Sequence, residues 1–200
     1  MDSTDFYSKN ANEYFEATVD LDMGVLLERF YEVVKEGGAV LDLGCGSGRD
    51  GLALLDHGFD VTLLDGCEEM CRLAEAHTGL DALHMRFEEM DFDEAFDGIW
   101  ASASLLHVKE EDMTDVYHRL IRSLVPGGVL YVSYRHGSFK GMRGERYFCD
   151  FTWTEFKKKL EEFPELEVIE TWKSMDLRKE HAGEKWLNVL LRKKEEPEEE

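Results

Sequence analysis

Hydrophobic positions recur every three or four residues over 23–34, and this spacing predicts an amphipathic helix that ends at Gly37 and Gly38. Its apolar face consists of Met23, Leu26, Leu27, Phe30, Tyr31 and Val34. A short apolar run at 39–43 then enters a glycine-rich turn, as a buried parallel strand would, and residues 52–55 continue as a helix that stops at Gly58. The pattern predicts a strand, a glycine turn and a helix.

The same alternation continues with a strand at 59–64, a helix at 68–77 and strands at 80–85 and 98–103. A strong helix follows, with Met113, Val116, Tyr117, Leu120, Ile121 and Leu124 on one face. Pro126, Gly127 and Gly128 end it before a strand at 129–134. Alternating strands and helices need crossover connections, and right-handed crossovers give a parallel sheet covered by helices on both faces. We therefore expect a doubly wound α/β fold.

The last part of the chain has a different pattern. Thr152 and Glu155 form a capping box before a helix that carries Phe156 and Leu160. Apolar runs at 166–172 and 186–191 predict two strands that form a terminal hairpin. We expect one domain over residues 1–192 and an acidic, disordered tail at 193–200.

The amino-acid composition limits the kinds of molecule that the protein is expected to bind. The formal charge is −21, and it stays at −16 without the five glutamates of residues 195–200, so the folded body is itself acidic. Such a body disfavours nucleic acid, whose binding needs lysine and arginine, and favours a small molecule or a protein. The four cysteines contain no CxxC pair, no signal segment is recognisable, and no apolar run reaches the roughly 20 residues of a membrane span. We expect a reduced, cytoplasmic protein.

The glycine-rich turn carries the clearest chemical signal. Glycines at 44, 46 and 48 end a strand and open a helix, where the backbone can approach a nucleotide-like ligand closely. Asp65 lies at the end of the next strand, where a carboxylate can accept both hydroxyls of a ribose. A dinucleotide fingerprint would need glycine at 49, where this chain has Arg49, and no P-loop lysine follows the glycines.

Several motifs occur in a defined order: Asp-Leu-Gly-Cys-Gly-Ser-Gly at 42–48, Asp65, the strand start Phe-Asp-Gly-Ile-Trp at 96–100, and Leu-Val-Pro-Gly-Gly at 124–128. Together they resemble the motifs of class I S-adenosylmethionine (SAM)-dependent methyltransferases, nearest to small single-domain members of the tellurite-resistance type. The resemblance covers roughly residues 7–192. It implies a Rossmann-like, mostly parallel sheet of seven strands whose last strand is antiparallel, with SAM as methyl donor and S-adenosylhomocysteine as product.

The resemblance also implies roles for individual residues on the donor side. Ser102 would face the sulfonium of SAM, and the N-terminal helices within residues 1–36 would cover the cofactor. Many relatives read the adenine amino group with an acidic residue where this chain has Arg86, so we expect the backbone of Phe87 to replace it. The expected cofactor-binding residues are Asp42, Gly44, Cys45, Gly46, Asp65, Gly66, Met70, Phe87 and Ser102.

The acceptor side is less well specified by the sequence. His107 is a candidate general base, although methyl transfer needs mainly alignment, and a histidine there can simply line the loop. A basic, glycine-punctuated loop at 135–148 is expected to form a lid that binds a carboxylate or phosphate; alternatively, its charges only balance acidic neighbours. Tyr7 and Tyr14 would close over the ligands or merely pack. The expected substrate-binding residues are Tyr7, Tyr14, Arg135, Arg143, Arg146 and Tyr147.

We expect no metal site. Cys67 and Cys71, four residues apart, are compatible with metal or arsenite ligation, but buried, inert thiols explain them better. The favoured hypothesis is an enzyme that moves a methyl group from SAM to an oxygen, nitrogen or sulfur nucleophile of a small, anionic molecule. The alternative is a catalytically silent SAM-binding module with a regulatory or interaction role. Both are compatible with a monomer or a homodimer.

Overall fold

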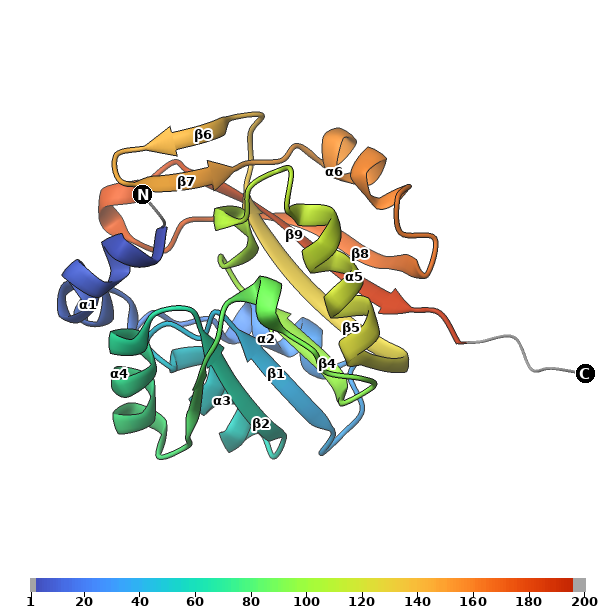
Figure 1. Ribbon diagram of the computed structural model, residues 1–200, viewed down its shortest axis with the longest axis horizontal. Coiled ribbons are helices and arrows are strands. Elements are labelled where there is room, and N and C mark those ends of the chain that lie inside the picture. The colour runs from blue at the N-terminus through green and yellow to red at the C-terminus, as the bar shows by residue number, and fades with distance from the viewer. Residues whose placement is uncertain (1–2, 196–200) are drawn as a thin grey trace, which may run out of the picture.

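The computed structural model describes residues 3–195, except for the side chain of Glu180. Its centre is a twisted sheet of seven strands in the order β3-β2-β1-β4-β5-β9-β8, with helices on both faces (Figure 1). The strands are β1 (Ala39–Leu43), β2 (Asp60–Asp65), β3 (Ala82–His84), β4 (Phe96–Ala101), β5 (Leu124–Arg135), β8 (Leu166–Met175) and β9 (Lys185–Lys193).

The first five strands pair in parallel, whereas β9 runs antiparallel to both of its neighbours, β5 and β8. This arrangement confirms the predicted doubly wound α/β fold with a mostly parallel sheet and an antiparallel last strand. It also confirms the terminal hairpin formed by β8 and β9.

The helices lie close to their predicted positions. They are α1 (Ser3–Thr18), α2 (Gly24–Tyr31), α3 (Arg49–Asp56), α4 (Glu68–Thr78), α5 (Met113–Ser123) and α6 (Trp153–Leu160), with short 3-10 turns at Phe87–Glu89, Leu105–His107 and Lys179–His181. The capping box is present, because the Thr152 hydroxyl accepts the Glu155 amide while the Glu155 carboxylate accepts the Thr152 amide. Within the described residues no helix has the length and apolar character needed to cross a bilayer.

Two hydrophobic cores flank the sheet, because neighbouring strand residues point to opposite faces. Ile99 belongs to the core beneath α5 and α6, and its neighbour Trp100 to the core beneath α2 and α3. Leu130 and Tyr131 of β5 divide in the same way. Burial on both faces explains why the central strands are apolar runs rather than alternating patterns.

Two details differ from the sequence prediction. Pro126, Gly127 and Gly128 lie inside β5, where the pairing with β4 is irregular. The basic segment expected to be a loop contains a hairpin, β6 (Lys140–Arg143) and β7 (Arg146–Cys149), that forms its own two-stranded sheet. Its glycines looked like loop signals, but Gly144, at φ 60, makes the tight turn between the strands. Of the predicted tail, residues 196–200 lie outside the described part of the chain.

Candidate functional site

Two adjoining cavities open at the carboxyl ends of the parallel strands, where ligands bind in open α/β sheets. We call them the β5-side cavity and the β2-side cavity, after the strands that contribute to their walls. The β5-side cavity has a volume of about 960 Å³ and the β2-side cavity about 770 Å³, each including its open mouth. The residues that line both are Tyr7, Tyr14, Gly44, Gly46, Ser102, Ala103 and His107. A ligand in one cavity can therefore meet a ligand in the other beside these residues.

Most of the sequence-predicted site residues do line these cavities. Asp42, Cys45, Arg135 and Arg146 line the β5-side cavity, whereas Asp65, Gly66, Met70, Arg86 and Phe87 line the β2-side cavity. The structure does not place Arg143 or Tyr147 among the residues that line either cavity.

The glycine turn between β1 and α3 brings bare backbone to the cavities. Gly44 has φ 74, and a Cβ there would lie 2.4 Å from the Ser104 Cβ, so this position requires glycine for both backbone and space. At Gly46, with φ 52, the nearest neighbour of a Cβ would be the Tyr14 ring at 3.7 Å. A side chain at 46 would therefore project into the cavity, and its absence leaves room for a ligand.

Asp65, the last residue of β2, fixes the other side of the turn. Its carboxylate accepts hydrogen bonds from the amides of Gly46 at 3.0 Å and Cys67 at 2.9 Å. Burial raises the pKa of Asp65, and these two backbone hydrogen bonds oppose that rise. Each carboxylate oxygen has a further acceptor site, so two ligand hydroxyls can still bind there.

Asp42 lies on the opposite side of the turn and is almost completely buried. Its Oδ2 has no hydrogen-bond partner among the described residues. Burial and the nearby Asp50 raise the pKa of Asp42 well above its usual value, while Arg49 opposes the rise. A buried carboxylate oxygen without a partner indicates a missing donor, and the ammonium group of an amino acid would supply one.

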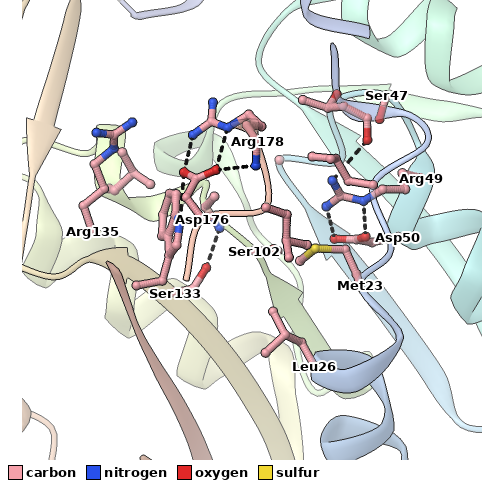
Figure 2. A pocket seen from close by; sticks show the side chains of 18 of the residues that line it. Met23, Leu26, Ser47, Arg49, Asp50, Ser102, Ser133, Arg135, Asp176 and Arg178 are labelled. Carbon is pink, nitrogen blue, oxygen red and sulfur yellow. Dashed lines mark hydrogen bonds and ion pairs between the residues drawn. The ribbon is translucent and has the colours of Figure 1, made fainter. Parts of the chain in front are cut away.

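Arg49 and Asp50 form an ion pair near Asp42, and hydrogen bonds reinforce it. Arg49 donates to Asp50 from two nitrogens at 2.6 and 2.9 Å, and the buried indole of Trp100 donates to the same carboxylate at 2.8 Å. In Figure 2 this pair lies on one side of the β5-side cavity, and the pair Arg178–Asp176 lies on the other. The second pair was not predicted, since nothing in the sequence showed that the β8–β9 connection would reach the cavity.

The turn after β4 has unusual backbone geometry. Ala103 adopts φ 53, which is uncommon for a residue other than glycine, and its amide donates to the Ser133 hydroxyl at 2.8 Å. Such conformations persist where neighbouring structure holds them, and they cluster at functional sites. Ser102 and Ala103 are thereby held where the two cavities meet.

His107, Tyr7 and Arg146 converge there from three distant elements. His107 Nδ1 lies 2.7 Å from the Tyr147 carbonyl oxygen, and Nε2 lies 2.8 Å from the Tyr7 hydroxyl. Arg146 Nη1 donates to the same hydroxyl at 3.2 Å, and the guanidinium lies over the Phe6 ring at 4.4 Å. α1 and β7 pack against each other here (Figure 1).

The three predicted basic residues have different partners. Arg135 forms an ion pair with Glu184. Arg143 donates to both oxygens of the buried Asp150, at 2.9 and 2.5 Å, so its charge balances an acidic neighbour, as the alternative interpretation proposed. Within residues 3–195, Arg146 forms no ion pair and lines the β5-side cavity.

Ligand atoms of Asp176, His181 and Glu184 lie within 4.8 Å of one another. Arginines already neutralise both carboxylates, because Arg178 binds Asp176 and Arg135 binds Glu184. Both carboxylates of this cluster therefore already take part in ion pairs.

The cysteines resemble buried hydrophobic residues rather than ligands. Cys45, Cys67, Cys71 and Cys149 are all free and buried. Burial, with Asp65 nearby, raises the pKa of Cys71 to about 12, so its protonated thiol form dominates at neutral pH. Metal and arsenite bind the thiolate, and this environment disfavours that form.

Comparisons with known proteins agree with this geometry. Residues 40–128 match a family model described as a methyltransferase domain. An uncharacterized methyltransferase from Staphylococcus carnosus is 34% identical over 95 residues, which span 48% of this chain and 46% of that protein. The chain therefore matches less than half the length of this curated relative.

Two solved structures share the fold. A 1,6-didemethyltoxoflavin-N1-methyltransferase from Burkholderia thailandensis, with bound 1,6-didemethyltoxoflavin and S-adenosylhomocysteine, has a TM-score of 0.77 at 21% identity, over 96% of this chain and 87% of that one. A complex of the Haloferax volcanii Trm112 methyltransferase activator with a putative methyltransferase has a TM-score of 0.78 at 19% identity, over 98% and 100%. None of these names the tellurite-resistance type, which stays a prediction. Residues 40–128 thus match a methyltransferase domain, and the chain has the Rossmann-like fold of class I SAM-dependent methyltransferases.

Proposed function

We propose that this protein is a SAM-dependent methyltransferase that acts on an oxygen, nitrogen or sulfur nucleophile of a small molecule carrying an anionic group. The observation that carries the proposal is the glycine turn beside two carboxylates, the buried Asp42 and Asp65, which accepts the Gly46 amide, where two cavities adjoin. We further propose that residues 1–192 form one domain.

The donor-side residues fit the parts of SAM. The unpartnered oxygen of Asp42 suits the ammonium of the methionine part, and the space beside Gly46 and Cys45 suits its chain. Asp65 suits the ribose hydroxyls, while Gly66, Met70 and Phe87 offer the β2-side cavity to adenine. When bound, SAM supplies a methyl group activated by a sulfonium. Ser102, which lines both cavities, suits the place where that methyl group meets the acceptor.

The remainder of the β5-side cavity suits the acceptor. Arg135 and Arg178 are neutralised by their carboxylate partners, whereas Arg146 forms no ion pair within the described part of the chain. A guanidinium without an acidic partner, in a protein of net charge −21, favours an anionic group on the acceptor. Tyr7 and Tyr14 of α1 line both cavities, which supports a covering role for this helix.

Calorimetry with SAM and S-adenosylhomocysteine tests the proposal. We expect micromolar binding, and we expect Asp65→Ala to weaken it by a factor of about 10 to 150, since a hydrogen bond to a charged group contributes about 1.5–3 kcal/mol. Asp60→Ala, at the exposed start of the same strand, is the control and leaves binding unchanged.

Absence of SAM binding by the wild-type chain would refute the proposal, as would unchanged binding in Asp65→Ala. Tight SAM binding without turnover on a panel of small anionic acceptors would favour the silent binding module instead.

A further inference from the structure

We propose that Tyr7 is the residue that receives the acceptor's proton, and that it passes its own proton to His107. The acceptor is then an O–H or N–H nucleophile that must lose a proton during the reaction. This inference rests on the proposed function and adds a chemical role for Tyr7 that the sequence did not indicate.

The hydrogen-bond partners fix the direction of the relay. A backbone carbonyl can only accept, so His107 Nδ1, 2.7 Å from the Tyr147 oxygen, carries a proton. Nε2 of the neutral ring is therefore an acceptor, and the Tyr7 hydroxyl donates to it at 2.8 Å. Arg146 donates to the Tyr7 oxygen at 3.2 Å. One lone pair of that oxygen remains for an acceptor group.

The position of Tyr7 suits this role. Tyr7 and His107 both line the two cavities, as Ser102 does, so an acceptor placed where the cavities adjoin lies beside these side chains. Burial raises the pKa of Tyr7, with smaller increases from Tyr14 and Asp65, while Arg146 opposes the rise. Tyr7 is thus neutral at physiological pH, and it accepts a proton only by releasing its own.

The acceptor's oxygen or nitrogen forms a bond to the methyl carbon, the donor's S–CH3 bond breaks, and its electron pair stays on sulfur. The acceptor's proton moves to the Tyr7 oxygen while the Tyr7 proton moves to His107 Nε2, which becomes an imidazolium. Solvent then removes a proton from His107.

The backbone of Tyr147 joins the relay to the N-terminal helix. Its carbonyl holds His107, and its amide donates to the Ser3 hydroxyl of α1 at 3.2 Å. Arg146, the preceding residue, holds Tyr7 of the same helix. The relay is therefore assembled from residues of both α1 and β7.

Nitrogen NMR of the histidine rings tests the relay without an acceptor. In the wild-type chain with S-adenosylhomocysteine bound, we expect His107, assigned through His107→Gln, to carry its proton on Nδ1. Tyr7→Phe keeps that tautomer but shifts the Nε2 resonance, because the hydroxyl donor is lost. Tyr31→Phe is the matched control, since the Tyr31 hydroxyl donates to the Ala53 carbonyl outside both cavities.

A proton on Nε2, or an unchanged Nε2 resonance in Tyr7→Phe, would overturn the relay. Failure of the proposed function is a separate result, because the wild-type chain would then not bind S-adenosylhomocysteine in calorimetry.

Kinetics with a matched pair of acceptors gives an independent readout. 4-Hydroxybenzoate must lose a proton to react, whereas 4-mercaptobenzoate reacts as its thiolate. Tyr7→Phe and His107→Gln are expected to lower transfer to the hydroxyl by about 100-fold or more, and to change transfer to the thiolate by less than about threefold. Equal losses on both acceptors would show that Tyr7 only positions ligands, and would overturn the proposal.

Discussion

Three glycine-to-alanine substitutions separate the ligand-binding role of the glycine turn from its folding role. Gly44, Gly46 and Gly79 all have positive φ, at 74, 52 and 75. They differ in what an added Cβ would meet. At Gly44 it collides with Ser104 at 2.4 Å, at Gly46 it projects beside the Tyr14 ring, and at Gly79, the end of α4, nothing lies within 4 Å.

The expected costs follow from these neighbours. Placing alanine in a left-handed conformation costs about 1 kcal/mol, so Gly79→Ala is expected to lower Tm by about 2–4 °C without affecting binding. Gly46→Ala has a similar stability cost, but its methyl group occupies ligand space and weakens S-adenosylhomocysteine binding by about tenfold or more, equivalent to about 1.4 kcal/mol. Gly44→Ala adds about 1–3 kcal/mol of overpacking, for a total of about 2–4 kcal/mol.

Urea unfolding and calorimetry measure the two effects separately. Wild-type affinity in a folded Gly46→Ala variant would show that the donor does not bind beside this turn. If Gly44→Ala were no less stable than Gly79→Ala, the packing argument for Gly44 would be wrong.

Two further predictions concern charged side chains. Although burial opposes ionisation of Asp176, hydrogen bonds from Arg178 and Trp186 lower its pKa. The ionised Asp176 carboxylate therefore stabilises the fold above the unfolded-state pKa, and this stabilisation is lost as pH falls through the folded-state pKa. Asp176→Asn is therefore expected to be less stable than wild type at pH 7, with a difference that shrinks below about pH 4 in thermal unfolding; a difference that grows on acidification would contradict this. Arg143→Ala leaves the buried Asp150 without its bidentate partner and is expected to cost about 2 kcal/mol in urea unfolding, against less than about 0.5 kcal/mol for Arg72→Ala in an exposed pair. A cost for Arg143→Ala no larger than that of Arg72→Ala would refute the second prediction.

The sequence by itself determined the order of the seven strands of the main sheet and of the helices between them, because hydrophobic spacing reports how each segment is buried. It also predicted the residues that we propose bind the donor. Gly44, Gly46 and Asp65 lie at the ends of neighbouring parallel strands, so the fold brings them together wherever the strands pair. The local sequence pattern was sufficient to predict that these residues lie together, because each is positioned by the strand that ends beside it.

The proposed acceptor side depends on contacts between distant parts of the chain. Tyr7 lies 100 residues from His107 and 139 from Arg146, yet their side chains meet through hydrogen bonds. Ion-pair partners decided which basic residues line the cavity, and the spacing of residues in the sequence does not reveal those partners. Arg143, for example, pairs with Asp150. The basic segment also formed a hairpin instead of the expected loop. Periodicity records the burial of a segment, whereas the partner of a charged side chain depends on which segments the tertiary structure packs against it, and only the structure decided that.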